Sequence, residues 1–178
     1  MRVIAGIAKG KTLTALEGTE VTRPTSDRVK EALFGSIQFD LQDAEILDAF
    51  SGSGALSIEA LSRGAKRAVM VEKERAAVEI IKKNLAACGL SDKAQILEGD
   101  FLLETDRIKG PFDFIFLDPP YRAGLYEGAL LAISERGLLK EDGKIICEHD
   151  DTAALGDLFV QIKQKKYGKT YLSVLGRK

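Results

Sequence analysis

Residues 112–121 read FDFIFLDPPY. The first six, Phe112–Leu117, are mostly aromatic and β-branched side chains in a short run, which is typical of a buried strand. The run ends at Asp118-Pro119-Pro120-Tyr121, where each proline lacks an N–H and holds the residue before it in extended geometry. These four residues predict a rigid group of oxygen acceptors beside an aromatic face, which suits a planar, amine-bearing guest such as a nucleobase. The simpler alternative is a turn in which Asp118 caps the next element.

Apolar segments of strand type and helix type alternate on both sides of this stretch. Alternation of this kind implies right-handed crossovers and a doubly wound, mostly parallel sheet. The pattern therefore predicts an α/β, Rossmann-like fold. The expected strands are Ile46–Phe50, Ala68–Val71, Gln95–Leu97, Phe112–Leu117 and Lys144–Glu148, and the expected helices are Gly54–Arg63, Ala76–Cys88 and Leu125–Ser134.

The two ends of the chain depart from this alternation. Segments 2–6 and 12–15 flank a Lys-Gly-Lys turn, which predicts an N-terminal β-hairpin. A helix is expected over about 26–39, after a run of capping residues. Segments 158–162 and 170–175 predict a closing antiparallel hairpin. We expect one domain over residues 1–178, with 1–40 as an appendage of hairpin and helix and 41–178 as the Rossmann-like core.

Composition narrows the class of protein. The chain has 178 residues, of which 45% are hydrophobic and 30% charged, and its net charge is −1, which is ordinary for a globular domain. No apolar segment approaches the length of a membrane span, and the N-terminus has no hydrophobic signal region. With His149 the only histidine and two unclustered cysteines, a histidine-built metal centre is excluded. We therefore expect a cytoplasmic protein, monomeric, without a metal ion or a membrane partner.

Positive charge gathers at the two ends of the chain. Residues 1–30 carry six basic and three acidic side chains, and residues 161–178 carry six basic and no acidic ones. This asymmetry is compatible with a surface that contacts phosphates, although solvated tails and an edge strand protected by lysines explain it equally well. The candidate RNA-binding residues are Arg23, Thr25, Arg28, Lys163, Lys165 and Lys166.

A second group of candidate residues follows the expected strands. The segment from Asp48 to Gly54 reads DAFSGSG and opens a helix, and glycines at such a turn let a ligand approach the backbone closely. Ser57 stands where a dinucleotide fingerprint has its third glycine. All these positions lie at carboxyl ends of strands, where an open α/β sheet binds its ligand, so together they predict a bound adenosine moiety. The candidate cofactor-binding residues are Asp48, Phe50, Ser51, Gly52, Gly54, Glu72, Asp100 and Phe101.

The nucleotide site and the Asp-Pro-Pro-Tyr motif together resemble the class I S-adenosylmethionine-dependent methyltransferases that methylate exocyclic amines of bases. The N-terminal segments and residues 23–34, which read RPTSDRVKEALF, narrow the resemblance. From Arg2 to the last strand the chain resembles the bacterial family that methylates guanine N2 in 16S ribosomal RNA.

This resemblance implies S-adenosylmethionine as the cofactor and 16S rRNA, or the assembling small ribosomal subunit, as the partner. It also implies that the loop 48–54 and Glu72 hold the methionine and ribose parts, and that Asp100 and Phe101 hold the adenine. Residues 118–121 would hold the target base.

Three other functions are compatible with parts of the sequence. A DNA adenine-N6 methyltransferase uses the same amine chemistry, but such enzymes usually carry a separate target-recognition domain. A non-catalytic RNA- or ribosome-binding module would be free to lose the acidic and Gly-x-Gly positions, yet all are present. An NAD-linked dehydrogenase is disfavoured by Ser57 and by the Asp-Pro-Pro-Tyr motif.

Overall fold

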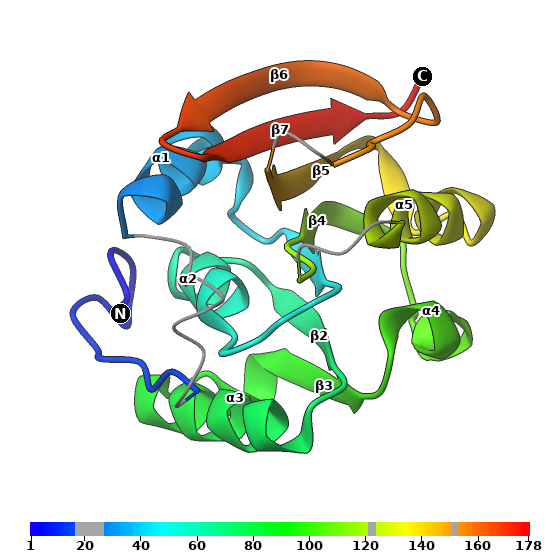
Figure 1. The fold of residues 1–178 in the computed structure, drawn as a ribbon. Coiled ribbons are helices and arrows are strands. Elements are labelled where there is room, and N and C mark those ends of the chain that lie inside the picture. The colour runs from blue at the N-terminus through cyan, green and yellow to red at the C-terminus, as the bar shows by residue number, and fades with distance from the viewer. Residues whose placement is uncertain (17–26, 121–123, 151–152) are drawn as a thin grey trace.

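One seven-stranded sheet forms the centre of the molecule (Figure 1), in the order β3-β2-β1-β4-β5-β7-β6. The computed structural model describes residues 1–16, 27–120, 124–150 and 153–178. Strands β1 to β5 pair in parallel, and β7 is antiparallel to both β5 and β6. The predicted mostly parallel sheet and its closing antiparallel hairpin are thus confirmed. The strands are β1 (Glu45–Asp48), β2 (Arg67–Glu72), β3 (Ala94–Glu98), β4 (Phe112–Leu117), β5 (Leu139–His149), β6 (Val160–Tyr167) and β7 (Thr170–Gly176).

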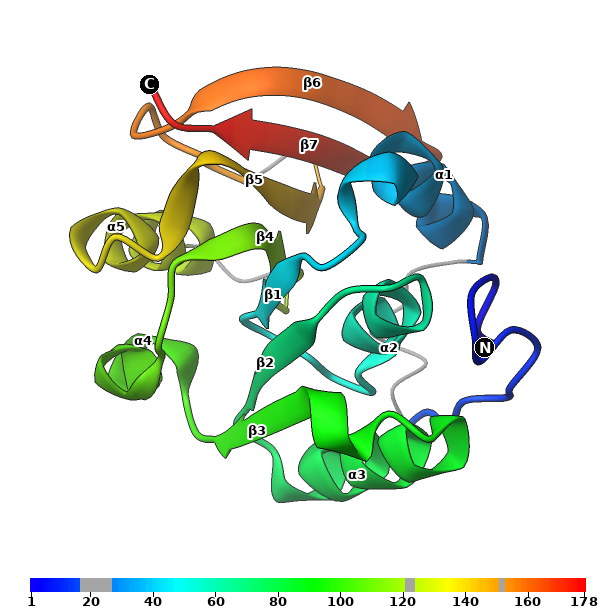
Figure 2. The same ribbon diagram turned by 180° about the vertical axis from the view of Figure 1, so that it is seen from behind.

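Helices cover both faces of the sheet. Helices α1, α2 and α3 lie on one face, and α4 and α5 lie on the other (Figures 1 and 2). Each face has its own apolar cluster, because successive residues of a strand point to opposite sides; Ile46 of β1 belongs to the first cluster and Leu47 to the second. The elements are α1 (Asp27–Ile37), α2 (Ala55–Ser62), α3 (Arg75–Cys88), α4 (Phe101–Glu104) and α5 (Leu125–Glu135), with short 3-10 helices at Gln38–Asp40, Ser91–Lys93 and Thr105–Arg107.

The predicted helices and core strands lie within a few residues of the observed ones, but helix α4 was not predicted. None of the helices in the described ranges has the length and apolar character needed to cross a membrane.

The expected N-terminal β-hairpin is present only in reduced form, without the extended strands that the sequence predicts. Residues 1–16 form a single antiparallel bridge, Arg2 with Thr12, and no strand. Three backbone hydrogen bonds join the two sides of the segment, from Val3 to Lys11, from Gly10 to Val3 and from Leu13 to Met1, at 2.9, 2.9 and 3.0 Å. The next amides, those of Ile4 and Ala5, donate instead to the carboxylate of Glu59 at 2.8 and 3.0 Å. The pairing of the segment with itself is therefore short, and the segment is also bonded to α2.

A buried ion pair connects this segment to α1 and α2. Lys30 of α1 and Glu59 of α2 are both fully buried, and the Lys30 ammonium lies 3.4 Å from Glu59. The same ammonium donates to the backbone oxygen of Arg2 at 2.5 Å, and Arg63 donates to Glu59 at 2.7 Å. Buried charges persist when they are paired and hydrogen-bonded, so Glu59 joins three segments that are distant in sequence.

The C-terminal hairpin is longer than the sequence predicts. Strand β6 begins at Val160 and continues to Tyr167, so the lysines at 163, 165 and 166 lie in a strand and not in its turn. Its length follows its partner, since Val160 pairs with Gly176 and Tyr167 pairs with Thr170 across the hairpin. Lysines on an edge strand also oppose pairing with a further chain.

Replacing Glu59 by Ala is expected to lower the free energy of unfolding by about 3–5 kcal/mol, because Lys30 is left buried without its counter-ion. Urea denaturation measures this loss. The matched control is Glu79→Ala on α3, where the pair with Lys82 is exposed and contributes little to stability. Equal effects of the two substitutions would contradict the assigned role of Glu59.

Candidate cofactor and base-binding site

The candidate residues gather because parallel strands end at one edge of the sheet, which we call the carboxyl edge. Strand β1 pairs with β2 on one side and with β4 on the other, and the strand order reverses between β1 and β4. Ligands of open α/β sheets bind at such a reversal. Asp48 and Glu72 are the last residues of β1 and β2, and Asp118 directly follows β4, so these carboxylates lie at the carboxyl edge beside the reversal.

The loop from Asp48 to Gly54 is held between the two strands that flank β1. The backbone amide of Ala49 donates to Phe116 of β4 at 3.1 Å, and that of Ser51 donates to Val71 of β2 at 3.0 Å. Gly54 has φ +79°, and a Cβ there would lie 2.7 Å from the side chain of Met70, so this position requires glycine. The backbone of the loop is therefore rigidly presented at the carboxyl edge.

Two acidic side chains, those of Asp48 and Glu72, form hydrogen bonds that hold this loop and the start of α2 in place. Asp48 is buried and accepts a hydrogen bond from the Ser57 hydroxyl at 2.8 Å. Glu72 accepts from the amides of Gly52 and Glu74 at 2.8 and 2.9 Å. A carboxylate offers about four acceptor positions, so Glu72 keeps acceptor capacity for ligand hydroxyls. In the sequence, Ser57 was notable only because it replaces the third glycine of a dinucleotide fingerprint. The structure shows that it is the hydrogen-bond partner of Asp48.

Asp100 and Phe101 lie at the start of α4. Asp100 caps this helix, accepting from the amide of Leu102 at 2.9 Å. The side chain of Phe101 is buried, and its ring packs against that of Phe50, with the centroids 5.8 Å apart. Core side chains enclose the Phe101 ring, and the expectation that Asp100 and Phe101 hold an adenine stays a prediction. Phe50 is only partly buried, so it is the aromatic ring of this pair that a ligand can still reach.

The charge of the site favours a cationic ligand. Burial raises the pKa of Asp48 to about 7; the Ser57 hydrogen bond opposes this rise, and the nearby negative charge of Glu72 adds to it. A positive charge on a ligand would favour the ionised form of Asp48. The acidic groups at the ends of β1 and β2 therefore make this part of the carboxyl edge electrostatically suited to a cation.

The Asp-Pro-Pro segment continues β4 at the same edge. Asp118 is half-buried, Pro119 is buried and Pro120 is exposed, whereas Tyr121 lies outside the described residues. Leu117 pairs with Cys147 of β5, so the parallel register brings Glu148 beside Asp118. Glu148 was not selected from the sequence as a candidate site residue. It carries the same signal that identified Asp48 and Glu72, a carboxylate at the end of an expected strand.

Next to Glu148 in the chain, His149 forms hydrogen bonds that reach the C-terminal hairpin. The ring nitrogens of His149 lie 2.6 Å from the backbone oxygen of Asp150 and 2.8 Å from the hydroxyl of Ser173 on β7. The His149 ring also stacks on Tyr171, with an interplanar angle of 13°. His149 is therefore a packed residue of the sheet, which joins the end of β5 to β7.

The structure separates the candidate RNA-binding residues. Arg28 is exposed in the first turn of α1, and Arg23 and Thr25 lie outside the described residues. Alternation along β6 directs Lys163 and Lys165 toward α1, whereas Lys166 lies on the other face, with its ammonium 4.9 Å from the ring centre of Tyr171. The expected group of three lysines is thus divided between the two faces of the sheet.

Comparison with known proteins identifies the family. A family profile described as "Conserved hypothetical protein 95" matches residues 1–176. The chain belongs to this family. YlbH of Bacillus subtilis (strain 168), provisionally named an rRNA methyltransferase, is 40% identical over 98% of this chain and 97% of its own length. Ribosomal RNA small subunit methyltransferase D of Haemophilus influenzae is 38% identical over 83% of this chain and 78% of its own length. The resemblance to small-subunit rRNA methyltransferases seen in the sequence is confirmed.

Solved structures with the same fold support this assignment. A structure from Escherichia coli, provisionally named methyltransferase yhhF, superimposes with a TM-score of 0.88, at 31% identity, and the match covers 100% of this chain and 98% of the other. The hypothetical protein TTHA0928 of Thermus thermophilus gives a TM-score of 0.82 at 28% identity, over 99% of each chain. The Rossmann-like class I methyltransferase fold predicted from the sequence is confirmed.

Replacing Asp48 by Asn is expected to change how stability depends on pH. Because the folded-state pKa of Asp48 is raised from 3.8 to about 7, its contribution to stability is present at low pH and is lost as the pH rises through 7. Asparagine has no such dependence. The difference in free energy of unfolding, Asp48→Asn minus wild type, should therefore increase between about pH 4 and about pH 7, by up to about 1.4 kcal/mol per pH unit.

Denaturation in the absence of cofactor, repeated at several pH values, measures this difference. The control is Asp92→Asn, at an exposed position, which should follow the pH dependence of the wild type. A constant offset between Asp48→Asn and the wild type over this range would show that Asp48 is ionised throughout.

Proposed function

We propose that this protein transfers a methyl group from S-adenosylmethionine to the exocyclic N2 amine of a guanine in 16S rRNA. The observation that carries the proposal is the position of Asp118 and Pro119. They follow β4, directly across the strand reversal from the glycine-containing loop that follows β1. The names of relatives that act on small-subunit rRNA support the nature of the substrate.

The residues around the strand reversal fit S-adenosylmethionine, whose sulfonium supplies a methyl group already activated for transfer. The loop from Ser51 to Gly54 approaches the ligand through its backbone, and Asp48 and Glu72 provide the negative charge that favours a cation. Glu72 accepts from the ribose hydroxyls. Asp100 and Phe101 would hold the adenine, with the partly buried ring of Phe50 beside them.

Asp118 and the Pro119 carbonyl act on the target amine. The lone pair of an exocyclic amine is delocalised into the ring, so the nitrogen is a weak nucleophile. Acceptors for its two N–H groups favour the pyramidal nitrogen of the transition state over the flat ground state. Asp118 then takes the released proton. The base must leave its stack to enter such a site, where Tyr121 stacks on it.

The other expectations have no direct test in the structure. Binding of RNA by Arg23, Thr25, Arg28 and the β6 lysines, a monomeric state, a cytoplasmic location and the absence of a metal ion stay predictions. So do the single domain over residues 1–178 and its division at residue 40. Residues on both sides of that division, such as Phe34 and Ile46, share one apolar cluster.

Asp118→Ala is expected to lower turnover by about a hundredfold, because it removes an acceptor used mainly in the transition state. Affinity for S-adenosylhomocysteine should change by less than about twofold, since Asp118 contacts the base and not the cofactor. Transfer of tritiated methyl groups to 16S rRNA, to small-subunit particles and to duplex DNA measures the first, and calorimetry measures the second.

The control for Asp118→Ala is Asp92→Ala, at an exposed position away from the carboxyl edge. Near-normal turnover of Asp118→Ala would refute the proposed chemistry, and methylation of duplex DNA alone would refute the substrate. Mapping of modified bases in 16S rRNA from cells with and without the gene should reveal a single N2-methylguanosine that disappears.

A further inference from the structure

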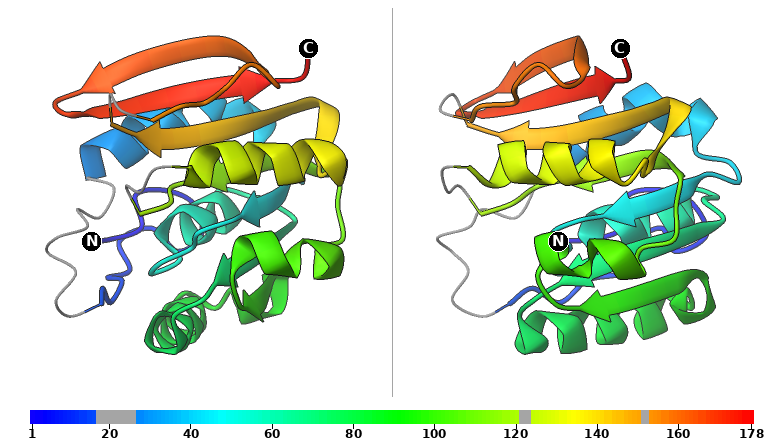
Figure 3. Two further views of the ribbon diagram at one scale, coloured as in Figure 1. Left: turned by 45° about the vertical axis from the view of Figure 1, so that its right-hand side comes forward. Right: turned by 90° about the vertical axis from the view of Figure 1, so that its right-hand side faces the viewer.

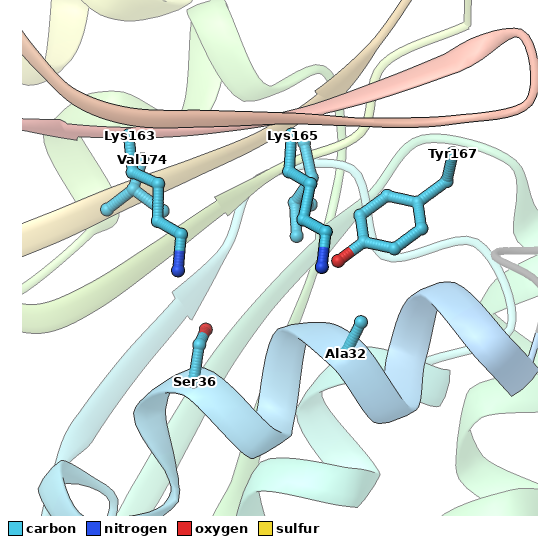
Figure 4. Close-up of a pocket in the computed structure, with 7 residues that line it drawn as sticks. Ala32, Ser36, Lys163, Lys165, Tyr167 and Val174 are labelled. Atoms are coloured by element: carbon cyan, nitrogen blue, oxygen red, sulfur yellow. The ribbon is translucent and has the colours of Figure 1, made fainter.

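A groove between α1 and β6 lies outside the candidate site. It encloses about 130 Å³. Ala32 and Ser36 of α1 form one wall, Lys163, Lys165 and Tyr167 of β6 form the other, and two apolar side chains of β7 close it. Figure 4 shows both lysine side chains with their nitrogens directed toward α1.

The groove is positively charged and has no acidic residue in its lining. Lys163 and Lys165 are two residues apart on one face of a strand, so their backbone positions are about 7 Å from each other. Neither lysine forms an ion pair with any residue in the described ranges. Ser36 donates its hydroxyl hydrogen to Leu33 at 2.7 Å, so the side-chain donors of the groove are the two ammonium groups and the Tyr167 hydroxyl. An anion bound in the groove would reduce the repulsion between the two ammonium groups.

The direction of the groove relates it to the carboxyl edge. Strand β6 runs in the same direction as β5, because each is antiparallel to β7. Tyr167, the last residue of β6, is therefore at the carboxyl edge, and Lys163 lies farther from it. In Figure 3 the arrowhead of β5 and the first turn of α1 lie on the same side of the molecule. Helical spacing puts Arg28 on the same face of α1 as Ala32 and Ser36, at the end nearer the carboxyl edge.

An exposed aromatic residue, Phe39, follows α1 in the chain, beyond the helix end that lies farther from the carboxyl edge. Phe39 follows Ser36 by three residues, in the 3-10 helix after α1, and 90% of it is exposed, the largest fraction among the large hydrophobic residues described. Core packing does not explain this exposure. Basic side chains that follow a backbone, together with an aromatic side chain on which a base stacks, are the elements of single-stranded nucleic-acid binding.

We propose that the α1–β6 groove binds the phosphodiester backbone of an unpaired RNA strand that adjoins the target nucleotide. Lys163 and Lys165 contact phosphates, and Phe39 stacks on a base farther along the strand. The inference rests on the proposed function for its polynucleotide, since the strand leaves the carboxyl edge next to the base held by Asp118. Single-stranded RNA fits better than a duplex, whose bases are already stacked and present no face to Phe39.

The test compares the double variant Lys163→Glu/Lys165→Glu with the wild type in binding to a single-stranded fragment of 16S rRNA. Affinity at low salt should fall at least about tenfold, and the slope of log K against log salt should decrease by about 0.7 for each lost phosphate contact, or about 1.4 in all. The control, Lys83→Glu/Lys109→Glu, makes the same change of charge at two exposed positions away from α1 and β6, and it should keep the wild-type slope.

A second variant separates stacking from charge. Phe39→Ala should weaken binding by about fivefold or more, the lower range for loss of one stacked base, without changing the salt slope. All variants should bind S-adenosylhomocysteine like the wild type and keep its urea midpoint, which excludes misfolding as the cause.

The results distinguish the two proposals. If the wild type methylates 16S rRNA and the Lys163→Glu/Lys165→Glu variant keeps its affinity and slope, the groove assignment is overturned and the proposed function stands. If the wild type methylates no RNA, the proposed function fails first. An equal loss of affinity for duplex RNA in the lysine variant would overturn the choice of a single strand.

Discussion

Parallel pairing of β1 with both of its neighbours is the constraint on which the candidate site depends. It brings the ends of β2, β1 and β4 to one edge, so residues separated by more than sixty positions become neighbours. The reversal of strand order beside β1 leaves an opening that neither crossover fills. Asp48 ends β1 and Asp118 follows the adjacent β4, so both lie at the carboxyl edge beside this opening.

The distribution of charge follows from the different charges of the two proposed ligands. The carboxylates of Asp48 and Glu72 favour a cationic cofactor, but the same charge repels RNA phosphates. Contacts to the RNA backbone must therefore lie away from the strand reversal. Strand β6 meets this requirement, since four strands lie between it and β2, and its lysines are therefore well separated from the acidic site.

Buried polar contacts position the parts that the sheet does not. Glu59 is enclosed by donors from residues 1–16, from α1 and from Arg63 directly after α2, and it thereby connects α1 to α2. On the other face, His149 joins β5 to β7 through Ser173. These contacts connect the hairpin of β6 and β7 to the carboxyl edge, so the groove and the candidate site have a defined relative position.

The sequence by itself determined the order of strands and helices, the doubly wound sheet and the acidic residues at strand ends, because these depend on local hydrophobic period and on chain direction. Tertiary structure alone decided which polar groups meet. The pairing within residues 1–16 is shorter than expected, and Glu59, more than fifty residues away, binds the amides of Ile4 and Ala5. The ring of Phe101 is buried because it packs into the apolar cluster on the α4 and α5 face of the sheet, and the lysines of β6 are separated because a strand directs alternate side chains to opposite faces. Such partners depend on contacts between distant segments, which local patterns do not specify.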